Sequence, residues 1–185
     1  MKQLGLKLTA LFAVMILSAC SNGEKRDAII SETFKGNRLL PEGVSRIYID
    51  EVSDGSINST AKETFDIVLR RRINLNPQLS LIDTPDNSDL VLKLRLSGYS
   101  SKPFKYNESG EVIEKKLCLD AFVRMIYIPT GEEKIRNKFV KSELIYSDKN
   151  PPIMSEYNAI TSLTDLLAER IISVVTTGFY DEKSR

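Results

Sequence analysis

Residues 90–99 read Leu-Val-Leu-Lys-Leu-Arg-Leu-Ser-Gly-Tyr, the clearest alternation of apolar and polar side chains in the chain. Because successive side chains of a β-strand point to opposite faces, this pattern predicts a strand with one buried face and one wet face. The wet face carries Val91, Lys93, Arg95 and Ser97. The buried face carries four leucines, which are Leu90, Leu92, Leu94 and Leu96.

Two further strands are predicted downstream, each after a turn. Residues 107–110 predict a turn, and residues 112–127 then alternate throughout their length. At about 3.3 Å per residue such a strand reaches about 50 Å, so its start is expected to project from the body. Residues 129–131 predict a second turn and residues 134–146 a third strand. The sequence does not decide which face of this third strand is buried. Two sets of apolar residues on opposite faces are equally suitable: Ile135, Phe139 and Ile145, or Val140, Leu144 and Tyr146.

Two amphipathic helices flank these strands. Thr60 and Glu63 have the spacing of a capping box, so the first helix is predicted to begin there, and Pro77 forbids its continuation. The second helix is predicted over residues 156–177, with Ser155 as its N-cap. Apolar residues recur at helical spacing in both. They are Ala61, Phe65, Val68, Leu69 and Ile73, then Ala159, Ile160, Leu163, Leu166, Leu167, Ile171, Val174 and Val175.

The order of these elements predicts the fold class. Shorter strands are expected at residues 46–52 and 79–82, before and after the first helix. The prediction is a two-layer α+β sandwich, with two helices packed on one face of a mixed, mostly antiparallel sheet of four to five strands. One domain is expected over residues 39–180, followed by a polar tail at residues 181–185.

The N-terminal residues have the features of a secretory signal peptide. Lys2 and Lys7 give a positive start, residues 8–17 form an apolar run, and small residues follow it. This run is shorter than the roughly 20 apolar residues that a transmembrane helix needs. We therefore expect residues 1–19 to be removed.

The end of this segment predicts a lipid anchor. Leu17-Ser18-Ala19-Cys20 resembles a bacterial lipobox, which implies diacylation of the Cys20 thiol and acylation of the new amino terminus. Three acyl chains make a permanent membrane anchor. Residues 20–38 then form the lipidated cysteine and a polar tether. Ser21, which is not Asp, implies the outer membrane, with the domain on the periplasmic side.

Composition argues against most catalytic classes. With 26 Lys and Arg against 25 Asp and Glu, the chain has no overall positive field for nucleic acid. The absence of His excludes Ser-His-Asp and Cys-His triads and every His-containing metal site. We interpret Cys118 as a small buried hydrophobe and the arginines at 70–72 as a solvated helix face. The expectation is a protein that is not an enzyme and binds no metal, cofactor or nucleic acid.

The wet sheet face is the candidate binding surface. If the strands pair as consecutive hairpins, Lys93, Arg95 and Arg124 share this face with Phe122 and Ile126. Basic groups among apolar ones suit an amphipathic anionic lipid or a partner protein. An ordinary wet face with scattered apolar residues is an equally good interpretation.

A series of short motifs follows the lipobox in the sequence, from about Phe34 to Phe179. They are Phe34-Lys35-Gly36, residues 40–49, Asn58-Ser59-Thr60, Ser97-Gly98-Tyr99, residues 107–110, Ile128-Pro129-Thr130-Gly131 and Gly178-Phe179. In order and spacing they resemble the LptE family of lipopolysaccharide-assembly lipoproteins. Ser21-Asn22 departs from the family, many members of which carry Gly and an aromatic residue after the lipidated Cys.

The resemblance implies an outer-membrane lipoprotein that is not an enzyme. Such a protein has two helices against a four-stranded mixed sheet, plugs the β-barrel of its partner LptD and helps lipopolysaccharide reach the outer leaflet. It also implies contacts with lipopolysaccharide through basic residues near the sheet hairpins. Lys105, beside Phe104, occupies one matching position, and Lys149 corresponds loosely to a second, before the last helix.

A different class of function also fits. Several periplasmic lipoproteins that dock on cell-wall synthases or form secretion pores begin with a strand, an Asn-x-Thr helix start and a short second strand. That interpretation predicts a partner other than a barrel. The long central hairpin, with no cofactor motif, favours the plug.

Overall fold

The computed structural model describes residues 39–50, 52–54 and 58–178. The chain divides into two units, Met1–Arg38 and Leu39–Arg185, and the described residues belong to the second. The predicted signal peptide, Cys20, the tether and the C-terminal tail lie outside the described residues. They stay predictions.

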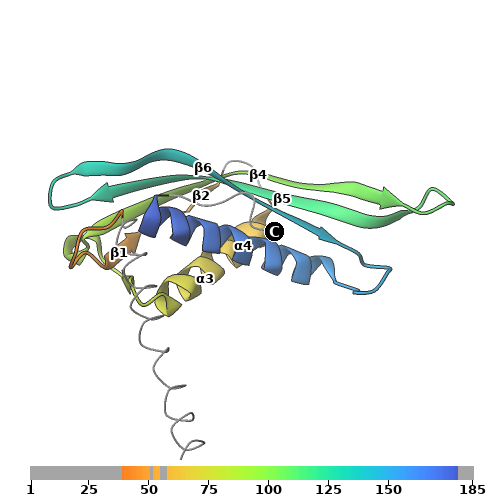
Figure 1. The fold of residues 1–185 in the computed structure, drawn as a ribbon, viewed down its shortest axis with the longest axis horizontal. Coiled ribbons are helices and arrows are strands. Elements are labelled where there is room, and N and C mark those ends of the chain that lie inside the picture. Colours follow the sequence, from red (N-terminus) through yellow and green to blue (C-terminus); the bar gives the residue numbers. More distant parts are fainter. Residues whose placement is uncertain (1–38, 51, 55–57, 179–185) are drawn as a thin grey trace, which may run out of the picture. The chain divides into compact units, whose positions relative to one another are not determined.

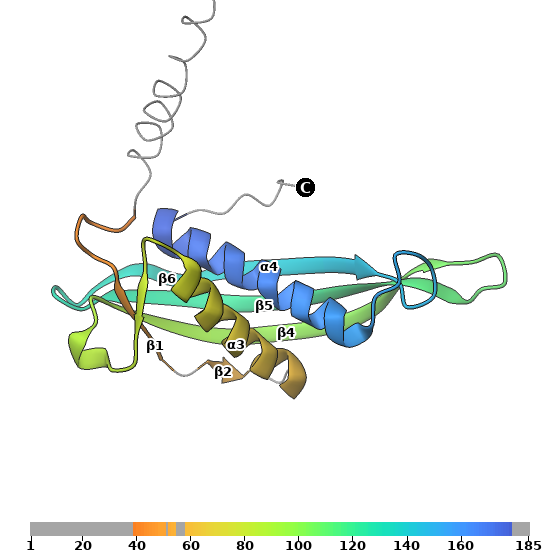
Figure 2. The same cartoon turned by 90° about the horizontal axis from the view of Figure 1, so that it is seen from below.

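The described chain forms one mixed sheet with two helices on one of its faces (Figures 1 and 2). The strands run in the order β3-β1-β4-β5-β6, and β2 pairs with β4 beside this path. β1 is parallel to β3 and β4, whereas β4, β5 and β6 are antiparallel. This confirms the predicted α+β sandwich. The elements are β1 (Arg46–Ile49), β2 (Ser53–Asp54), α3 (Ser59–Leu75), β3 (Ser80–Ile82), β4 (Leu90–Tyr106), β5 (Val112–Tyr127), β6 (Glu132–Tyr146) and α4 (Glu156–Thr177).

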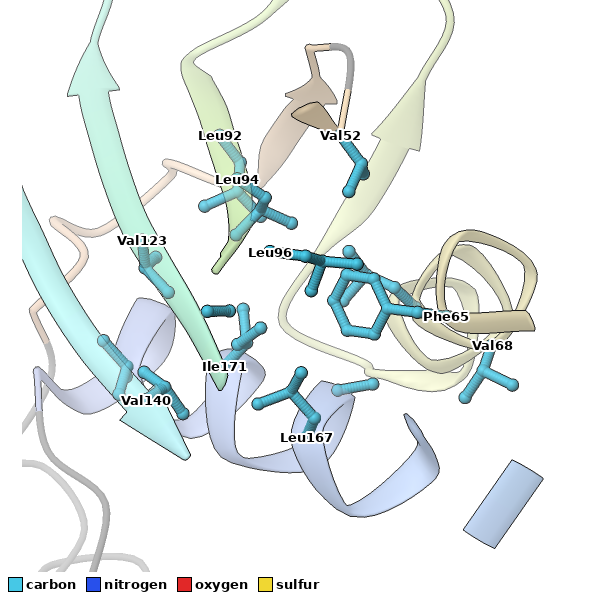
Figure 3. Close-up of a cluster of buried hydrophobic side chains, with 14 of the residues drawn as sticks. Val52, Phe65, Val68, Leu92, Leu94, Leu96, Val123, Val140, Leu167 and Ile171 are labelled. Carbon is cyan, nitrogen blue, oxygen red and sulfur yellow. The ribbon is translucent and has the colours of Figure 1, made fainter. Parts of the chain in front are cut away.

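Side chains of both helices fill the space under the sheet. Figure 3 shows Phe65 of α3 and Leu167 of α4 packed toward the leucines of β4. All the apolar positions predicted for α3 are buried, and so are those predicted for α4 except Leu166, which is half-buried. The leucines of residues 90–96 are buried as well, so the predicted core face is confirmed.

The strand predicted at residues 90–99 continues to Tyr106, because β5 pairs with it over that whole length. The register shifts between Leu96, opposite Ala121, and Gly98, opposite Asp120. Ser97 is therefore an extra residue, a β-bulge that reverses which side chains face the helices. Beyond the bulge the β4–β5 hairpin extends past the helices (Figure 1, right), as the predicted length of β5 suggested.

A second bulge decides the question left open for β6. Asn137 has a φ of 47°, and the register shifts between Val123, opposite Lys138, and Met125, opposite Ile135. The extra residue switches the alternation, so that Ile135 is buried before the bulge and Val140 after it. Each competing set was therefore right for one part of the strand.

The helix starts test two capping predictions. The N-cap of α3 is Asn58, whose side-chain oxygen accepts a hydrogen bond from the Thr60 N–H at 2.9 Å, so the capping box predicted at Thr60 is wrong. Asn58 takes this role because its short amide reaches the second free N–H of the helix. Ser155 caps α4 as predicted, accepting from the Asn158 N–H at 3.2 Å.

Arginines of α3 link the two helices. Arg72 Nε donates to Asp165 Oδ1 of α4 at 2.7 Å, and Arg71 reaches the same carboxylate at 3.5 Å. Arg70 instead pairs with Asp66, one turn earlier on α3. The predicted solvated face holds for Arg71, which is exposed, but is wrong for Arg72, because Asp165 lies on a helix that sequence spacing does not bring near.

A buried carboxylate joins β1 to β4. Asp89 Oδ1 accepts from the Arg46 guanidinium at 2.7 Å, and Asp89 Oδ2 accepts from the backbone N–H groups of Arg46 and Ser45 at 3.0 and 3.3 Å. The Arg46 hydrogen bond, above all, lowers the pKa of Asp89 to about 2. Since an unfolded Asp titrates near pH 3.9, this stabilisation is complete above about pH 4 and disappears as the pH falls toward 2.

Asp89→Asn is therefore expected to lower the free energy of unfolding at pH 7 by about 1 to 2 kcal/mol. The difference from the wild-type chain should shrink as the pH is lowered from 4 toward 2. Urea unfolding at pH 7, 4 and 3 measures both effects. Asp86→Asn, at an exposed position nearby, is the control. An equal loss of stability at all three pH values would contradict this role of Asp89.

Candidate functional site

The sheet face that turns away from α3 and α4, which we call the open face, gathers three of the predicted binding residues. The β4–β5 register places Lys93 opposite Arg124 and Arg95 opposite Phe122. The grouping predicted from consecutive hairpins is therefore confirmed. Further residues at positions of this face are Val91, Gly98, Ser100, Lys102, Lys116, Cys118, Asp120, Ile126, Phe139, Lys141, Glu143 and Ile145.

Two of these cations already have carboxylate partners from neighbouring strands or loops. Lys93 Nζ lies 2.8 Å from Asp50 Oδ2, just after β1. Arg124 pairs with Glu133 of β6, which also accepts from Arg136 at 3.0 Å. An anion binding at either position must therefore compete with an existing ion pair.

Arg95 differs because it stacks on an aromatic side chain. Its guanidinium carbon lies 4.8 Å from the centroid of the Phe122 ring, and that ring lies 5.4 Å from the Phe139 ring on β6. Arg95 makes no ion pair with the carboxylates that the structure describes. A guanidinium stacked on a ring keeps its in-plane N–H donors available. Arg95 is therefore the open-face candidate best prepared to receive an anion.

The structure does not bring Lys105 and Lys149 into this group. Lys105 lies on the projecting β4–β5 hairpin, with its side chain 61% exposed and its Nζ 3.7 Å from Glu114 Oε1. Phe104 and Tyr106, its neighbours in the strand, are also exposed. Lys149 is exposed in the loop between β6 and α4. The five predicted residues thus occupy three regions of the domain.

The turn of the projecting hairpin is closed by hydrogen bonds and carries acidic side chains. Asn107 Oδ1 accepts from the Glu111 N–H at 2.8 Å, and its Nδ2 donates to Glu111 Oε2 at 3.1 Å. Gly110 takes a φ of 80°, which glycine adopts without strain. Because Glu108 and Glu111 stand at the turn, an anion meets positive charge along the strands, not at the tip.

Three lysines that sequence reasoning missed also lie on the open face. Lys102 of β4 stands opposite Lys116 of β5, and Lys116 and Lys141 both contact Glu143. Unbroken alternation from residue 90 would turn Lys102 toward the helices, and only the bulge at Ser97 turns it outward. The alternation of β5 already places Lys116 on the face of Arg124, whereas Lys102 is found only once the register is known.

Cys118 is not the core residue that we predicted. It is half-buried on the open face, and its Sγ lies 3.7 Å from Glu143 Oε1. The core side of β5 is taken by its neighbours Leu117 and Leu119. In residues 39–178, apart from the undescribed positions, no three His, Cys, Asp or Glu side chains gather as a metal site would require. The described helices include none with the length and apolar character to cross a bilayer.

The fold is similar to those of solved bacterial proteins. It resembles the hypothetical protein CT253 from Chlamydia trachomatis, with a TM-score of 0.53, 10% identity and coverage of 72% of this chain and 96% of that one. It resembles the uncharacterized lipoprotein B from Nitrosomonas europaea, with a TM-score of 0.52, 15% identity and coverage of 76% and 87%. Protein XCC0632 from Xanthomonas campestris is also similar, with a TM-score of 0.51, 8% identity and coverage of 75% and 88%.

These likenesses, at low identity, concern the fold alone. No protein-family model matches the sequence, and no curated protein matches it either. The domain therefore has a fold that a bacterial lipoprotein also adopts.

Proposed function

We propose that this protein is an outer-membrane lipoprotein, anchored through Cys20, that assists lipopolysaccharide assembly as the plug and partner of an LptD-like β-barrel. The fold shared with a lipoprotein B supports this proposal, and so do the LptE-like motifs in order behind the lipobox. The observation that carries it is the β4–β5 hairpin, which extends past the helices and exposes Lys105 between Phe104 and Tyr106.

The chemistry of the exposed surfaces suits this role. Lipopolysaccharide is an amphipathic anionic lipid, and cations beside apolar rings match its anionic and acyl parts. Arg95 on Phe122 and Lys105 beside Phe104 are two such combinations. The proposed role is binding and assembly, not catalysis, and it requires no metal or cofactor.

Depletion of the protein in the producing cell tests the proposal. We expect lipopolysaccharide to accumulate beneath the outer leaflet, measured as loss of surface-accessible lipopolysaccharide at constant total amount. Normal surface lipopolysaccharide after depletion, together with a defect in cell-wall synthesis or secretion, would instead support the alternative of a lipoprotein that activates a cell-wall synthase or secretion complex.

Lys105→Asp tests the residue that the family resemblance singles out. Reversal of an exposed charge is expected to weaken lipopolysaccharide binding by about 1 kcal/mol, roughly fivefold, and more at low than at high salt. Thermal unfolding should be unchanged, because Lys105 is not part of the core. Titration of the purified full chain with lipopolysaccharide at two salt concentrations measures the effect. Lys138→Asp, exposed on β6, is the control, and wild-type binding by both variants would remove Lys105 from the site.

A further inference from the structure

Two lysines face each other on the open face, beyond the bulge at Ser97. Lys102 on β4 lies directly opposite Lys116 on β5, and Lys116 precedes the buried Leu117, so both side chains belong to the open face. Side chains at such positions have Cβ atoms about 5 Å apart, and like charges there destabilise the sheet. Folding stability alone does not favour this pair.

Glu143 compensates part of the charge of this region. Glu143 lies 2.5 Å from Lys116 Nζ and 2.5 Å from Lys141 Nζ. These two lysines lower the pKa of Glu143 to about 2, so the carboxylate is ionised at neutral pH. Lys102 makes no ion pair with a carboxylate in the part of the chain that the structure describes. The positive charge of these lysines is therefore larger than the negative charge of Glu143.

Two further acidic groups of the open face stand near these lysines. The first, Glu114, lies two residues before Lys116 and already contacts Lys105 Nζ at 3.7 Å. The second is Asp120. Asp120 stands opposite Lys141 on β6 and Gly98 on β4. Its Oδ1 atom is buried without a hydrogen-bond partner among the described residues, and burial raises the pKa of Asp120. No ion pair joins Asp120 to a lysine there. The four lysines of this region, Lys102, Lys105, Lys116 and Lys141, thus outnumber its three carboxylates, and the positive charge that remains can bind an external anion.

Two neighbours define the kind of anion. Ser100 precedes Lys102 by two residues, so its hydroxyl lies on the same face about 7 Å along the strand. Ile145, opposite Lys116 on β6, is an exposed apolar side chain. Paired ammonium groups and a hydroxyl suit the several oxygens of a doubly charged phosphate, and Ile145 suits an apolar body attached to it.

We propose that Lys102 and Lys116, assisted by Ser100, form a binding site for a phosphomonoester group. Lys141 holds the Glu143 carboxylate, so that Lys116 is shared between Glu143 and the bound phosphate. The inference deepens the proposed function, because it places the phosphate of an amphipathic ligand on the open face. It does not depend on a barrel partner, since every group in the site belongs to this chain.

Calorimetric titration of the full chain in detergent tests the site. The probes are dihexanoyl phosphatidic acid, a phosphomonoester, and dihexanoyl phosphatidylglycerol, a phosphodiester, with inorganic phosphate as a third arm. We expect phosphatidic acid to bind more tightly than phosphatidylglycerol. Lys102→Gln/Lys116→Gln should weaken its binding at least tenfold, whereas Lys138→Gln, at an exposed lysine of β6 outside the site, should not.

Each outcome decides the matter. Tighter binding of phosphatidic acid than of inorganic phosphate supports the site with a lipid headgroup as its source, and the reverse supports it with free phosphate. Absence of phosphomonoester binding, equal binding of phosphatidylglycerol, or equal losses in the double variant and in Lys138→Gln would overturn the site. None of these results depends on lipopolysaccharide transport in cells, so this site and the proposed function can fail separately.

Discussion

Leu94→Asp is expected to unfold the domain. Leu94 is 2% exposed and lies on the sheet face that packs against both helices (Figure 3). A carboxylate buried there without a partner costs several kcal/mol, against a total stability of about 5 to 15 kcal/mol for a domain of this size. Circular dichroism during heating should show no cooperative transition for this variant.

Ser101→Asp is the matched control for this substitution. Ser101 is exposed on the same strand, beyond the bulge at Ser97. The variant should unfold at nearly the wild-type temperature, because surface substitutions change stability by about 0.5 kcal/mol or less. An unchanged transition in Leu94→Asp would show that this face of β4 is not the core.

Cys20→Ala is expected to abolish lipidation, and with it anchoring through acyl chains. The predicted acyl chains attach through the Cys20 thiol, and no other residue of the lipobox can carry them. The variant should incorporate no labelled palmitate and should be recovered as a soluble or inner-membrane-retained precursor. Cys118→Ala, which changes the other thiol of the chain, should be labelled and processed like the wild type. Normal processing of Cys20→Ala would end the interpretation as a lipoprotein.

The sequence predicted the elements that depend on residues close together in the chain, such as strand alternation, helix caps and turns. The span of β5 agrees with its predicted range, because alternation continues without interruption from Val112 to Tyr127. The span of α4 also agrees, since Ser155 caps it and its apolar stripe is continuous. Both hairpins that join β4, β5 and β6 follow from turn residues at the predicted positions.

The bulges limited what the sequence could predict. Nothing in the alternation of residues 90–99 shows that Ser97 is an extra residue, because a bulge depends on pairing with another strand. The prediction consequently ended β4 at Tyr99 and missed Lys102 as an open-face residue. Asn137 had the same effect on β6, where neither competing set of apolar residues describes the whole strand.

The sequence predicted which basic residues share the open face, but not which of them form ion pairs. Strand parity was sufficient to place Lys93, Arg95 and Arg124 on one face. Their partners come from elements distant in sequence: Asp50 follows β1, and Glu133 lies on β6. Only the three-dimensional arrangement shows that Lys93 and Arg124 are paired, whereas Arg95 rests on Phe122.

Co-purification from detergent-extracted outer membranes tests the central claim most directly. The full chain, tagged at its C-terminus and expressed at its natural level, is isolated and its partners are identified by mass spectrometry. We expect a stable complex with a large outer-membrane β-barrel of the LptD type, in near-stoichiometric amount and with lipopolysaccharide bound. Recovery with a cell-wall synthase or a secretion complex, and without a barrel, would contradict the claim.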